Sequence, residues 1–383
     1  MGNLTINFLY FLPVIIWCVL IFFRGYFWRC DQIFNQRATG ALPSSVAVLI
    51  PARNESSTIG NVINSLNHQK ISGNMKIIVI DDNSCDDTIQ AAGVSANLKI
   101  IESGLPAEGW TGKLWALQQG ISEADKIFPE AEFFLFSDAD ILHAPGSLNQ
   151  LLLKAQAEEL ALVSLMVKLH CESFWERLLI PPFIFFFQKL YPFRWVNDPG
   201  NNTVAAAGGC MLIRKANLKK SGGLFSIKES IIDDCALAKN ISYTGKVWLG
   251  LSEETKSCRQ YSNLSSIWET VARTAFVQIN YSLINLFAVI IFMTVTYLCP
   301  PIFIVFSILI ADWWVFSIGL GITALMIFAF LPTIKYFKIS KIWALTLPVS
   351  SLFYIFITIS SAFQHLFGKG GSWKGRNYPK NYS

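Results

Sequence analysis

The sequence is poor in charged residues. Asp, Glu, Lys and Arg make up 15% of its 383 residues, whereas hydrophobic residues make up 52%. A soluble domain usually carries about 25% charged residues, so a chain that is soluble throughout is excluded and part of it is expected to lie in lipid. The apolar residues concentrate in the first 23 positions and after about position 279, which leaves a middle of ordinary globular character.

Long basic runs and paired cysteines are also missing. The net charge of +5 forms no basic stripe and no recognisable motif, so nucleic acid is not expected as a partner. A weak attraction to anionic lipid headgroups explains the same charge more simply. The eight cysteines show no Cys-x-x-Cys pair and no Cys/His spacing of a metal site. We therefore expect reduced, unpaired cysteines.

The first apolar run, residues 7–23, has no basic residue before it and is followed by Arg24 and Arg29. A signal peptide usually has a basic segment before the apolar run and a small-residue cleavage site after it. We therefore favour an uncleaved transmembrane anchor over residues 1–28, although the run is near the minimum length for spanning. The basic residues on its carboxyl side place the following domain in the cytoplasm.

Apolar runs recur toward the C-terminus, at 281–299, 302–331 and 343–366, and they are interrupted by Cys299-Pro300-Pro301, Asp312 and Lys335–Lys341. They predict three further spans in a membrane region over residues 281–367. The polar tail, residues 368–383, carries several basic residues, which argues against a third full crossing. Whether the last run spans the membrane or re-enters it is left open.

Residues 178–195 are apolar but short and interrupted by two prolines, so we do not expect them to span a bilayer. A helix in the core of the domain is one interpretation. A segment in the membrane interface is favoured, because Trp, Tyr, Arg and Lys flank its apolar face.

Between the apolar regions, short β-rich runs alternate with helix-like segments. The strand-like runs cover 46–51, 76–81, 98–102 and 133–137, and the helical segments cover 58–67, 86–93 and 113–124. This alternation predicts βαβ units and a mostly parallel sheet with helices on both faces. Ligands in such sheets bind beyond the carboxyl ends of the strands, where the polar clusters of this sequence fall.

Asp138 and Asp140 follow the strand 133–137 directly. Residues two apart in extended conformation point to the same face, so we expect the two carboxylates to lie together. They would repel each other without a cation between them. Hard oxygen ligands suit Mg²⁺ or Mn²⁺, which also bridge substrate phosphates, so the pair predicts a metal site for a diphosphate.

Two polar motifs lie earlier in the chain, one at a strand end and one at a helix start. Asp81 and Asp82 follow a strand, where a turn that caps the next helix is the alternative to a ligand site. Lys113 opens a helix after Gly109 and Gly112, which suits a phosphate contact or a solvated surface lysine equally.

Asp233 and Asp234 stand between apolar residues at a helix start. They would cap the helix, and their mutual repulsion would also suit one of them as a general base with a raised pKa. The small-residue run 205–214 is either tightly packed or an open floor for a substrate, and we leave both readings open.

The order of the motifs resembles the inverting glycosyltransferase family 2, of GT-A fold, over about residues 44–280. The motifs are Pro51-Ala52-Arg53-Asn54-Glu55, Asp81-Asp82-Asn83-Ser84, Gly112-Lys113, Asp138-Ala139-Asp140 and Asp233-Asp234. Segments such as Gly-Trp-Thr-Gly-Lys and Ile-Asp-Asp-Cys-Ala-Leu-Ala are similar to the hopene-associated glycosyltransferases, bacterial inner-membrane proteins linked to hopanoid biosynthesis. The implied fold class is a cytosolic, Rossmann-like α/β GT-A domain plus transmembrane helices.

The resemblance also implies a role for each matching position. Asp234 and Asp233 would be catalytic, with Asp234 as the base, and Asp140 and Asp138 would hold the metal. The nucleotide-sugar would contact Pro51, Arg53, Glu55, Asp81, Asp82, Lys113, Asp138 and Arg273. Of the Gln-x-x-Arg-Trp motif that many relatives carry, only Arg273 remains, which argues against processive polymer synthesis.

The function implied is metal-dependent, inverting transfer of a sugar from a nucleotide-sugar, with a UDP-sugar favoured, to a hydroxyl of a membrane lipid. A hopanoid or other isoprenoid is the favoured acceptor, and the expected location is the bacterial inner membrane. One alternative is synthesis of a short polysaccharide or a polyprenyl-phosphate sugar. A remoter one is a non-catalytic, nucleotide-binding membrane protein.

Overall fold

The computed structural model describes residues 2–34, 43–367, 372–373 and 376–377, and the chain divides into two compact units. The sheet unit comprises Gln32–His170, Trp195–Gln260 and Ser372–Ser383, and the helical unit comprises Met1–Asp31, Cys171–Arg194 and Tyr261–Gly371. The sequence-based domain of 44–280 therefore differs from the observed unit. Residues 171–194 and 261–280 group with the helices, because their apolar side chains pack into the core of the helical unit.

The sheet unit is built on a mostly parallel sheet with the strand order β1-β9-β7-β8-β5-β2-β3-β4. Its strands are β1 (Ile33–Phe34), β2 (Val46–Ala52), β3 (Met75–Asp81), β4 (Leu98–Glu102), β5 (Phe133–Ser137), β6 (Ile141–His143), β7 (Leu160–Lys168), β8 (Cys210–Arg214) and β9 (Lys246–Ser257). Strand β8 is antiparallel to both of its neighbours, and β6 pairs antiparallel with β9. The remaining pairs are parallel, as predicted.

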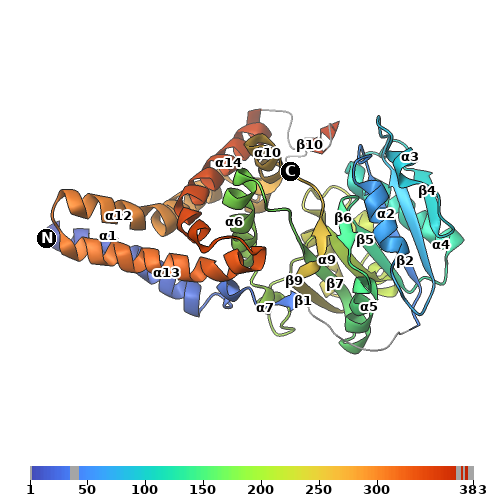
Figure 1. Cartoon of the computed structure of the whole chain (residues 1–383), viewed down its shortest axis with the longest axis horizontal. Helices are drawn as coiled ribbons and strands as arrows, with labels where there is room; N and C mark the ends of the chain where they lie inside the picture. The colour runs from blue at the N-terminus through green and yellow to red at the C-terminus, as the bar shows by residue number, and fades with distance from the viewer. Residues whose placement is uncertain (1, 35–42, 368–371, 374–375, 378–383) are drawn as a thin grey trace. The chain divides into compact units, whose positions relative to one another are not determined.

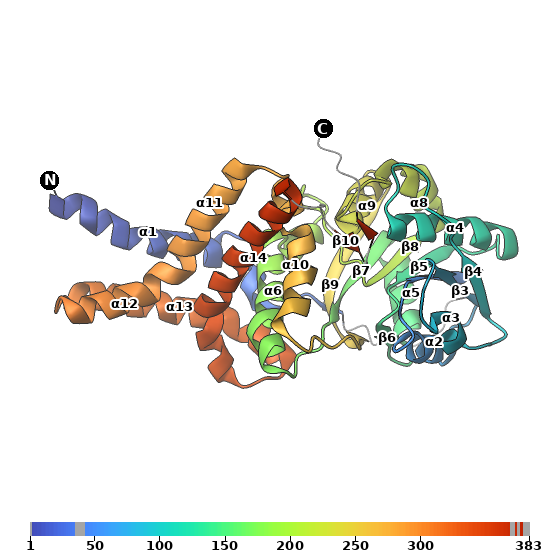
Figure 2. The same ribbon diagram turned by 90° about the horizontal axis from the view of Figure 1, so that it is seen from above.

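Helices cover both faces of this sheet (Figures 1 and 2). One layer contains α2 (Ile59–Asn67), α3 (Thr88–Ala92) and α5 (Ser147–Ala157), and the other contains α4 (Gly112–Ile127), α8 (Lys215–Lys220), η2 (Leu224–Ile227) and α9 (Asp233–Ser242). Side chains of β2 alternate between the layers: Val48 and Ile50 face one core, whereas Ala47 and Leu49 face the other. Such a strand is buried on both faces and therefore consists almost wholly of apolar residues.

The predicted elements of this unit are confirmed to within three residues. The runs 98–102 and 133–137 match β4 and β5 at both ends, and the helix predicted at 113–124 extends to Ile127. All eight cysteines are free, as expected. Of the polar tail 368–383, the structure describes only the paired strands β10 (Ser372–Trp373) and β11 (Arg376–Asn377), so the rest of that prediction lies outside the described residues.

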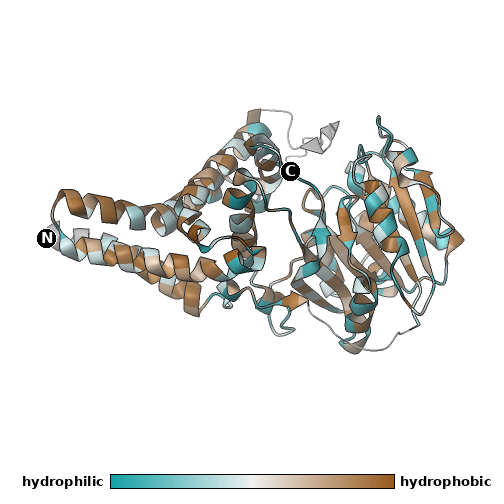
Figure 3. Ribbon diagram, viewed as in Figure 1, coloured by the Kyte–Doolittle hydropathy of each residue, from teal (hydrophilic) through white to brown (hydrophobic). Residues whose placement is uncertain are grey.

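The helical unit surrounds a second apolar core. Its helices are α1 (Gly2–Phe22), η1 (Phe27–Arg29), α6 (Phe174–Leu190), α10 (Leu264–Ala275), η3 (Val277–Ile279), α11 (Leu283–Met293), a π-helical turn η4 (Thr294–Leu298), α12 (Cys299–Leu309), α13 (Trp313–Phe337), η5 (Lys341–Thr346) and α14 (Leu347–Phe367), and the short α7 (Phe193–Val196) follows α6. Trp17, Phe185, Tyr297 and Phe330 are fully buried in this core. Hydrophobic residues make up most of these helices (Figure 3), and large apolar side chains such as Ile284 and Phe287 are exposed.

Three helical segments of the described chain are long and apolar enough to cross a membrane: Leu283–Leu309, Trp313–Phe337 and Lys341–Phe367. The predicted break at Cys299-Pro300-Pro301 is wrong. The π-helical turn η4 directly precedes these prolines, and they stand in the first turn of α12, so the helical segment continues through them. Proline is tolerated there because the N–H groups of the first turn of a helix have no partner within that helix. The chain reverses instead near Asp312, whose carboxylate caps α13 by accepting from Trp314 N at 3.0 Å.

Helix α1 has 21 residues, which corresponds to about 30 Å and matches the hydrocarbon thickness of a bilayer. Its apolar stretch within the described side chains, Tyr10–Phe22, is shorter than that. The anchor at residues 1–28 and the cytoplasmic side of the sheet unit therefore stay predictions.

The apolar segment 178–195 forms most of α6, which runs unbroken through Pro181 and Pro182. Proline has no N–H, so Pro182 leaves the carbonyl of Leu178 without its helical partner. Ser350 Oγ on α14 donates to that carbonyl at 2.7 Å, and Tyr354 Oη donates to the next carbonyl, Leu179 O, at 2.8 Å. The helix thus contributes to the core of the helical unit, and its placement in the membrane interface stays a prediction.

Replacing Ser350 with Ala should destabilise the helical unit by about 1–3 kcal/mol, because the buried carbonyl of Leu178 loses its donor. The melting temperature of the detergent-purified protein measures the effect. Ser340→Ala, at an exposed position, is the matched control and should change little. Equal melting temperatures for the two variants would contradict this account of the proline-containing helix.

His143 on β6 is a buried imidazole in the sheet unit, 2% exposed. Its Nε2 shares a hydrogen bond of 2.9 Å with Ser137 Oγ, and Gln69 Nε2 donates to its carbonyl at 3.1 Å. Burial lowers the pKa of His143 to about 4, so the ring is neutral in the folded protein.

Acid should therefore weaken the sheet unit through His143. Its folded pKa lies below the unfolded value of about 6.5, so the unfolded chain binds more protons and stability falls as the pH drops from about 6.5 to 4. The contribution amounts to roughly 3 kcal/mol. The free energy of unfolding is measured at pH 7 and at pH 4. Between these pH values His143→Gln should lose less stability than the unaltered protein. The control His68→Gln, at an exposed site, should lose as much as the unaltered protein. Parallel losses in all three proteins would refute the assignment.

Candidate active site

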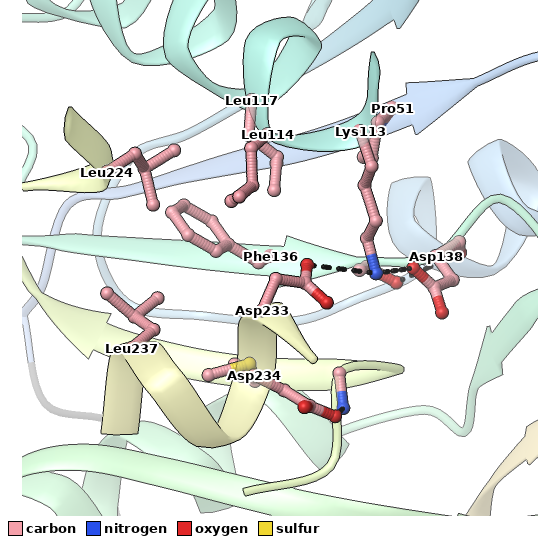
Figure 4. A pocket seen from close by; sticks show the side chains of 13 residues that line it. Pro51, Lys113, Leu114, Leu117, Phe136, Asp138, Leu224, Asp233, Asp234 and Leu237 are labelled. Carbon is pink, nitrogen blue, oxygen red and sulfur yellow. Dashed lines mark hydrogen bonds and ion pairs between the residues drawn. The ribbon is translucent and has the colours of Figure 1, made fainter. Parts of the chain in front are cut away.

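A pocket lies beyond the carboxyl ends of β2 and β5, where parallel sheets usually bind ligands. Figure 4 shows its charged side chains, which come from the start of α4, from the turn after β5 and from the start of α9. It is lined by Pro51, Lys113, Leu114, Leu117, Phe136, Ser137, Asp138, Gly208, Met211, Leu224, Asp233, Asp234 and Leu237. The structure thus brings together five of the predicted site residues: Pro51, Lys113, Asp138, Asp233 and Asp234.

Lys113 reaches between two carboxylates (Figure 4). Its Nζ lies 2.9 Å from Asp138 Oδ1 and 3.7 Å from Asp233 Oδ2. Burial by itself lowers the pKa of Lys113, but the carboxylates of Asp138 and Asp233 outweigh burial and hold that pKa well above its usual value. Lys113 is 20% exposed and carries a fixed positive charge into the pocket, so it is not a solvated surface lysine.

Asp234 is held in the pocket by backbone N–H groups. Gly208 N donates to its Oδ2 at 2.8 Å, and Cys235 N donates to its Oδ1 at 2.7 Å. A Cβ at Gly208 would stand 3.3 Å from Asp234 Oδ2 and 3.4 Å from Lys113 Nζ, so glycine allows this close approach. Burial, followed by the charge of Asp233, raises the pKa of Asp234 to about 6. It is therefore mostly ionised at pH 7 but still basic enough to accept a proton.

Asp138 and Asp140 do not continue the strand as predicted. Residues 138–140 form a turn between β5 and β6, in which Ile141 N donates to Asp138 O at 3.2 Å. Asp138 lies on Lys113, whereas Asp140 Oδ2 lies 3.0 Å from Arg259 Nε and accepts from Ser257 Oγ at 3.0 Å. The assumption of an extended conformation with both carboxylates on one face was therefore wrong, because the chain turns directly after Ser137.

Arg259 was not among the predicted site residues. It lies two residues beyond the end of β9, and the pairing of Ile141 with Ser257 brings it to Asp140, 119 positions away. Its Nη2 also lies 2.7 Å from Glu55 Oε1. No local motif in the sequence marks Arg259; only the pairing of β6 with β9 identifies it.

Glu55 was predicted to contact the nucleotide-sugar. In the structure its Oε1 pairs with Arg259 at 2.7 Å, and its Oε2 accepts from Thr58 Oγ1 at 3.1 Å. Burial and the charge of Asp138 raise the pKa of Asp140, against the opposing effect of Arg259. Glu55, Arg259 and Asp140 thus form one line of alternating charges.

Asp81 and Asp82 are buried at the end of β3. Asp81 Oδ2 accepts from Ser84 N at 3.2 Å in the expected turn, and Asp82 Oδ1 accepts from Ser103 Oγ at 3.1 Å. Arg53 Nη1 donates to the carbonyls of Asp82 and Asn83 and lies 3.8 Å from Asp82 Oδ2. These contacts give the three predicted site residues a structural role, and their contact with a nucleotide stays a prediction.

Arg273 lies on α10 in the helical unit and is half-buried. Arg273 is not among the residues that line the pocket, and its predicted contact with the nucleotide-sugar stays a prediction.

The donor groups present limit how a metal ion could be held. In the described part of the chain, no group of three or more His, Cys, Asp and Glu residues could hold a metal ion. Mg²⁺ and its analogues often take only one or two carboxylates and complete their shell with substrate phosphates and water. Asp138 is 38% exposed, and Oδ1 of Asp140 has no hydrogen-bond partner within the described residues. This pair fits a metal shared with a diphosphate, not one held by protein alone.

Part of the chain is similar to known glycosyltransferases. Residues 47–222 match the family model described as glycosyl transferase family 2. Over 109 residues the chain is 29% identical to a 4,4'-diaponeurosporenoate glycosyltransferase of Staphylococcus haemolyticus (strain JCSC1435), over 28% of this chain and 27% of that protein. The enzyme of the same name from Staphylococcus aureus (strain bovine RF122 / ET3-1) is 35% identical over 81 residues, 21% of each chain. The chain thus matches about a quarter of the length of these relatives.

A solved structure extends the similarity over nearly the whole chain. The mannosyltransferase PcManGT from Pyrobaculum calidifontis, in complex with GDP-Man and Mn²⁺, superposes with a TM-score of 0.53 at 16% identity, covering 93% of this chain and 98% of that chain. At this identity the likeness concerns the fold. Together with the sheet topology, it confirms the predicted GT-A fold, which is accompanied by three helical segments long and apolar enough to cross a membrane.

Replacing Lys113 with Met should leave three neighbouring carboxylates without their cation. We expect the free energy of unfolding to fall by about 1–3 kcal/mol at pH 8. The loss should be smaller at pH 5, because Asp234, with a pKa of about 6, is then protonated. Unfolding at both pH values measures this difference, and Lys113→Arg should retain most of the stability. A loss that does not depend on pH would contradict the electrostatic role of Lys113.

Proposed function

We propose that this protein, whose residues 47–222 carry a glycosyl transferase family 2 domain, moves a sugar from a nucleoside-diphosphate sugar to a hydroxyl of a membrane lipid. One observation carries the proposal. Asp234, a partly buried carboxylate with a pKa of about 6, lies in the same pocket as Lys113 and Asp138. A proton acceptor and a cation that suits phosphate are therefore available within one site.

Asp234 acts as the general base in this proposal. It takes the proton of the acceptor hydroxyl while the hydroxyl oxygen forms a bond to the anomeric carbon of the sugar. The bond from that carbon to the diphosphate oxygen breaks, and the nucleoside diphosphate leaves with the electron pair. Attack from the face opposite the leaving group inverts the anomeric configuration. Gly208 N and Cys235 N hold the carboxylate in place for this proton transfer.

Lys113 binds the diphosphate directly, and Asp138 and Asp140 would bind it through a divalent metal ion. Because its pKa is raised, Lys113 keeps its positive charge at neutral pH, and phosphate oxygens compete with Asp138 and Asp233 for it. Asp138 and Asp140 would hold Mg²⁺ or Mn²⁺, which neutralises the developing charge on the leaving diphosphate. The Mn²⁺ and GDP-Man in the solved mannosyltransferase are in keeping with this assignment.

The acceptor is a lipid hydroxyl, and a hopanoid or other isoprenoid is the favoured class. The three apolar helices support a membrane location, which we propose to be the bacterial inner membrane with the sheet unit in the cytoplasm. The two staphylococcal relatives, which are named for 4,4'-diaponeurosporenoate, fit a lipid acceptor. We favour a UDP-sugar as donor.

Asp234→Asn should reduce transfer by about 10²–10⁴-fold, because the amide cannot take the proton and removal of a general base costs this much. The measurement is release of nucleoside diphosphate from a panel of nucleotide-sugars with lipid extract and Mn²⁺. Asp87→Asn, at an exposed carboxylate, is the matched control and should keep full activity. Unchanged turnover in Asp234→Asn would refute the mechanism.

The pH profile should show the same base. Since Asp234 must be ionised, kcat/KM is expected to fall as the pH drops below about 6 and to be level above it.

Mass spectrometry of the lipid products separates the proposed function from its alternative. A single sugar on a neutral lipid supports the proposal, whereas a polyprenyl-phosphate sugar or a short polysaccharide identifies the other.

A further inference from the structure

We infer that Arg259 is a positioning residue for the metal ligand Asp140, and that Glu55 holds Arg259 in place for this task. The inference rests on the metal site of the proposed function. It extends that site by two residues, of which Arg259 was not foreseen and Glu55 was expected to contact the nucleotide-sugar itself.

The hydrogen bonds of Asp140 are unevenly divided between its two oxygens. Arg259 Nε and Ser257 Oγ both lie 3.0 Å from Oδ2, and Cys258 N donates to the backbone carbonyl of Asp140 at 2.9 Å. Within the described residues Oδ1 has no hydrogen-bond partner, so one oxygen is fixed by the protein and the other is available to a cation. Asp140 is 11% exposed, which limits the rotamers that it can adopt.

Arg259 is in turn fixed at its other end. Its Nη2 lies 2.7 Å from Glu55 Oε1, and Glu55 Oε2 accepts from Thr58 Oγ1 at 3.1 Å. The backbone of Glu55 is also held, because its N–H donates to Thr88 Oγ1 at 2.8 Å. The guanidinium therefore joins two carboxylates that would otherwise repel each other. Thr58 and Thr88 in turn hold Glu55 in place.

Carboxylates that bind metals are commonly hydrogen-bonded by a second layer of residues, and loss of such a partner weakens metal binding by about 10–100-fold. The arrangement around Asp140 matches this design, since the fixed oxygen sets the direction of the other one. The opposite effect is also physically conceivable, because a guanidinium near a divalent cation repels it. The two effects differ in sign, so a binding measurement decides between them.

The experiment measures Mn²⁺ affinity directly in the full-length protein in detergent. The rise in melting temperature is recorded against Mn²⁺ concentration at saturating UDP and, in parallel, GDP. Arg259→Gln should raise the apparent Kd for Mn²⁺ by about 10–100-fold, and Arg259→Lys, which keeps the charge, should lose less. Combining Arg259→Gln with Asp140→Asn should weaken binding no further than Asp140→Asn alone, because both changes act on one ligand.

Controls distinguish a failure of the inference about Arg259 from a failure of the proposed metal site. Lys220→Gln removes one exposed positive charge and should leave Mn²⁺ affinity unchanged. Unchanged affinity in both Arg259 variants would overturn the inference and leave the metal site intact. Tighter binding would also overturn it and would make Arg259 a competitor of the metal. If the unaltered protein shows no Mn²⁺-dependent shift with either nucleotide, the metal site of the proposed function fails, and the inference fails with it.

Discussion

Five carboxylates gather beyond the carboxyl ends of the strands, on Glu55, Asp138, Asp140, Asp233 and Asp234, and their mutual repulsion is the constraint on which the site depends. Two cations relieve it: Lys113 lies between Asp138 and Asp233, and Arg259 lies between Asp140 and Glu55. Each cation is held by carboxylates from different segments of the chain. The ion pairs therefore connect the turn after β5 to the starts of α4 and α9 through Lys113, and to Glu55 and the residues after β9 through Arg259.

The uneven sharing of these cations sets the chemistry of the carboxylates. Asp234 has only a distant share in Lys113 and is held instead by two backbone N–H groups, so burial and Asp233 raise its pKa to about 6. A carboxylate whose pKa lies near neutral pH can take up and release a proton, whereas a carboxylate paired closely with a cation would stay ionised. The same pocket thus contains a carboxylate with a pKa of about 6 and, in Lys113, a fixed positive charge.

A comparable balance of buried polar groups holds the helical unit together. Pro182 removes a hydrogen bond inside α6, and Ser350 on α14 restores a donor to the carbonyl that is left. The buried hydroxyls Ser350 Oγ and Tyr354 Oη of α14 therefore serve contacts between helices. In a low-dielectric core an unpaired carbonyl is costly, so such pairs orient neighbouring helices as well as stabilise them.

The sequence alone determined the class of the fold and the strand ends at which the candidate pocket lies. Apolar runs of strand and helix length are local features, and so is the position of Asp138 and Asp234 after a strand and at a helix start. They were sufficient because the carboxyl ends of parallel strands meet at one side of the sheet. Local spacing could not decide the turn at 138–140, the continuation of the helix through Pro300 or the partner of Asp140. These depend on contacts between segments far apart in the chain: Arg259 reaches Asp140 only because β6 pairs with β9, and strand pairing of that range leaves no mark in a local pattern.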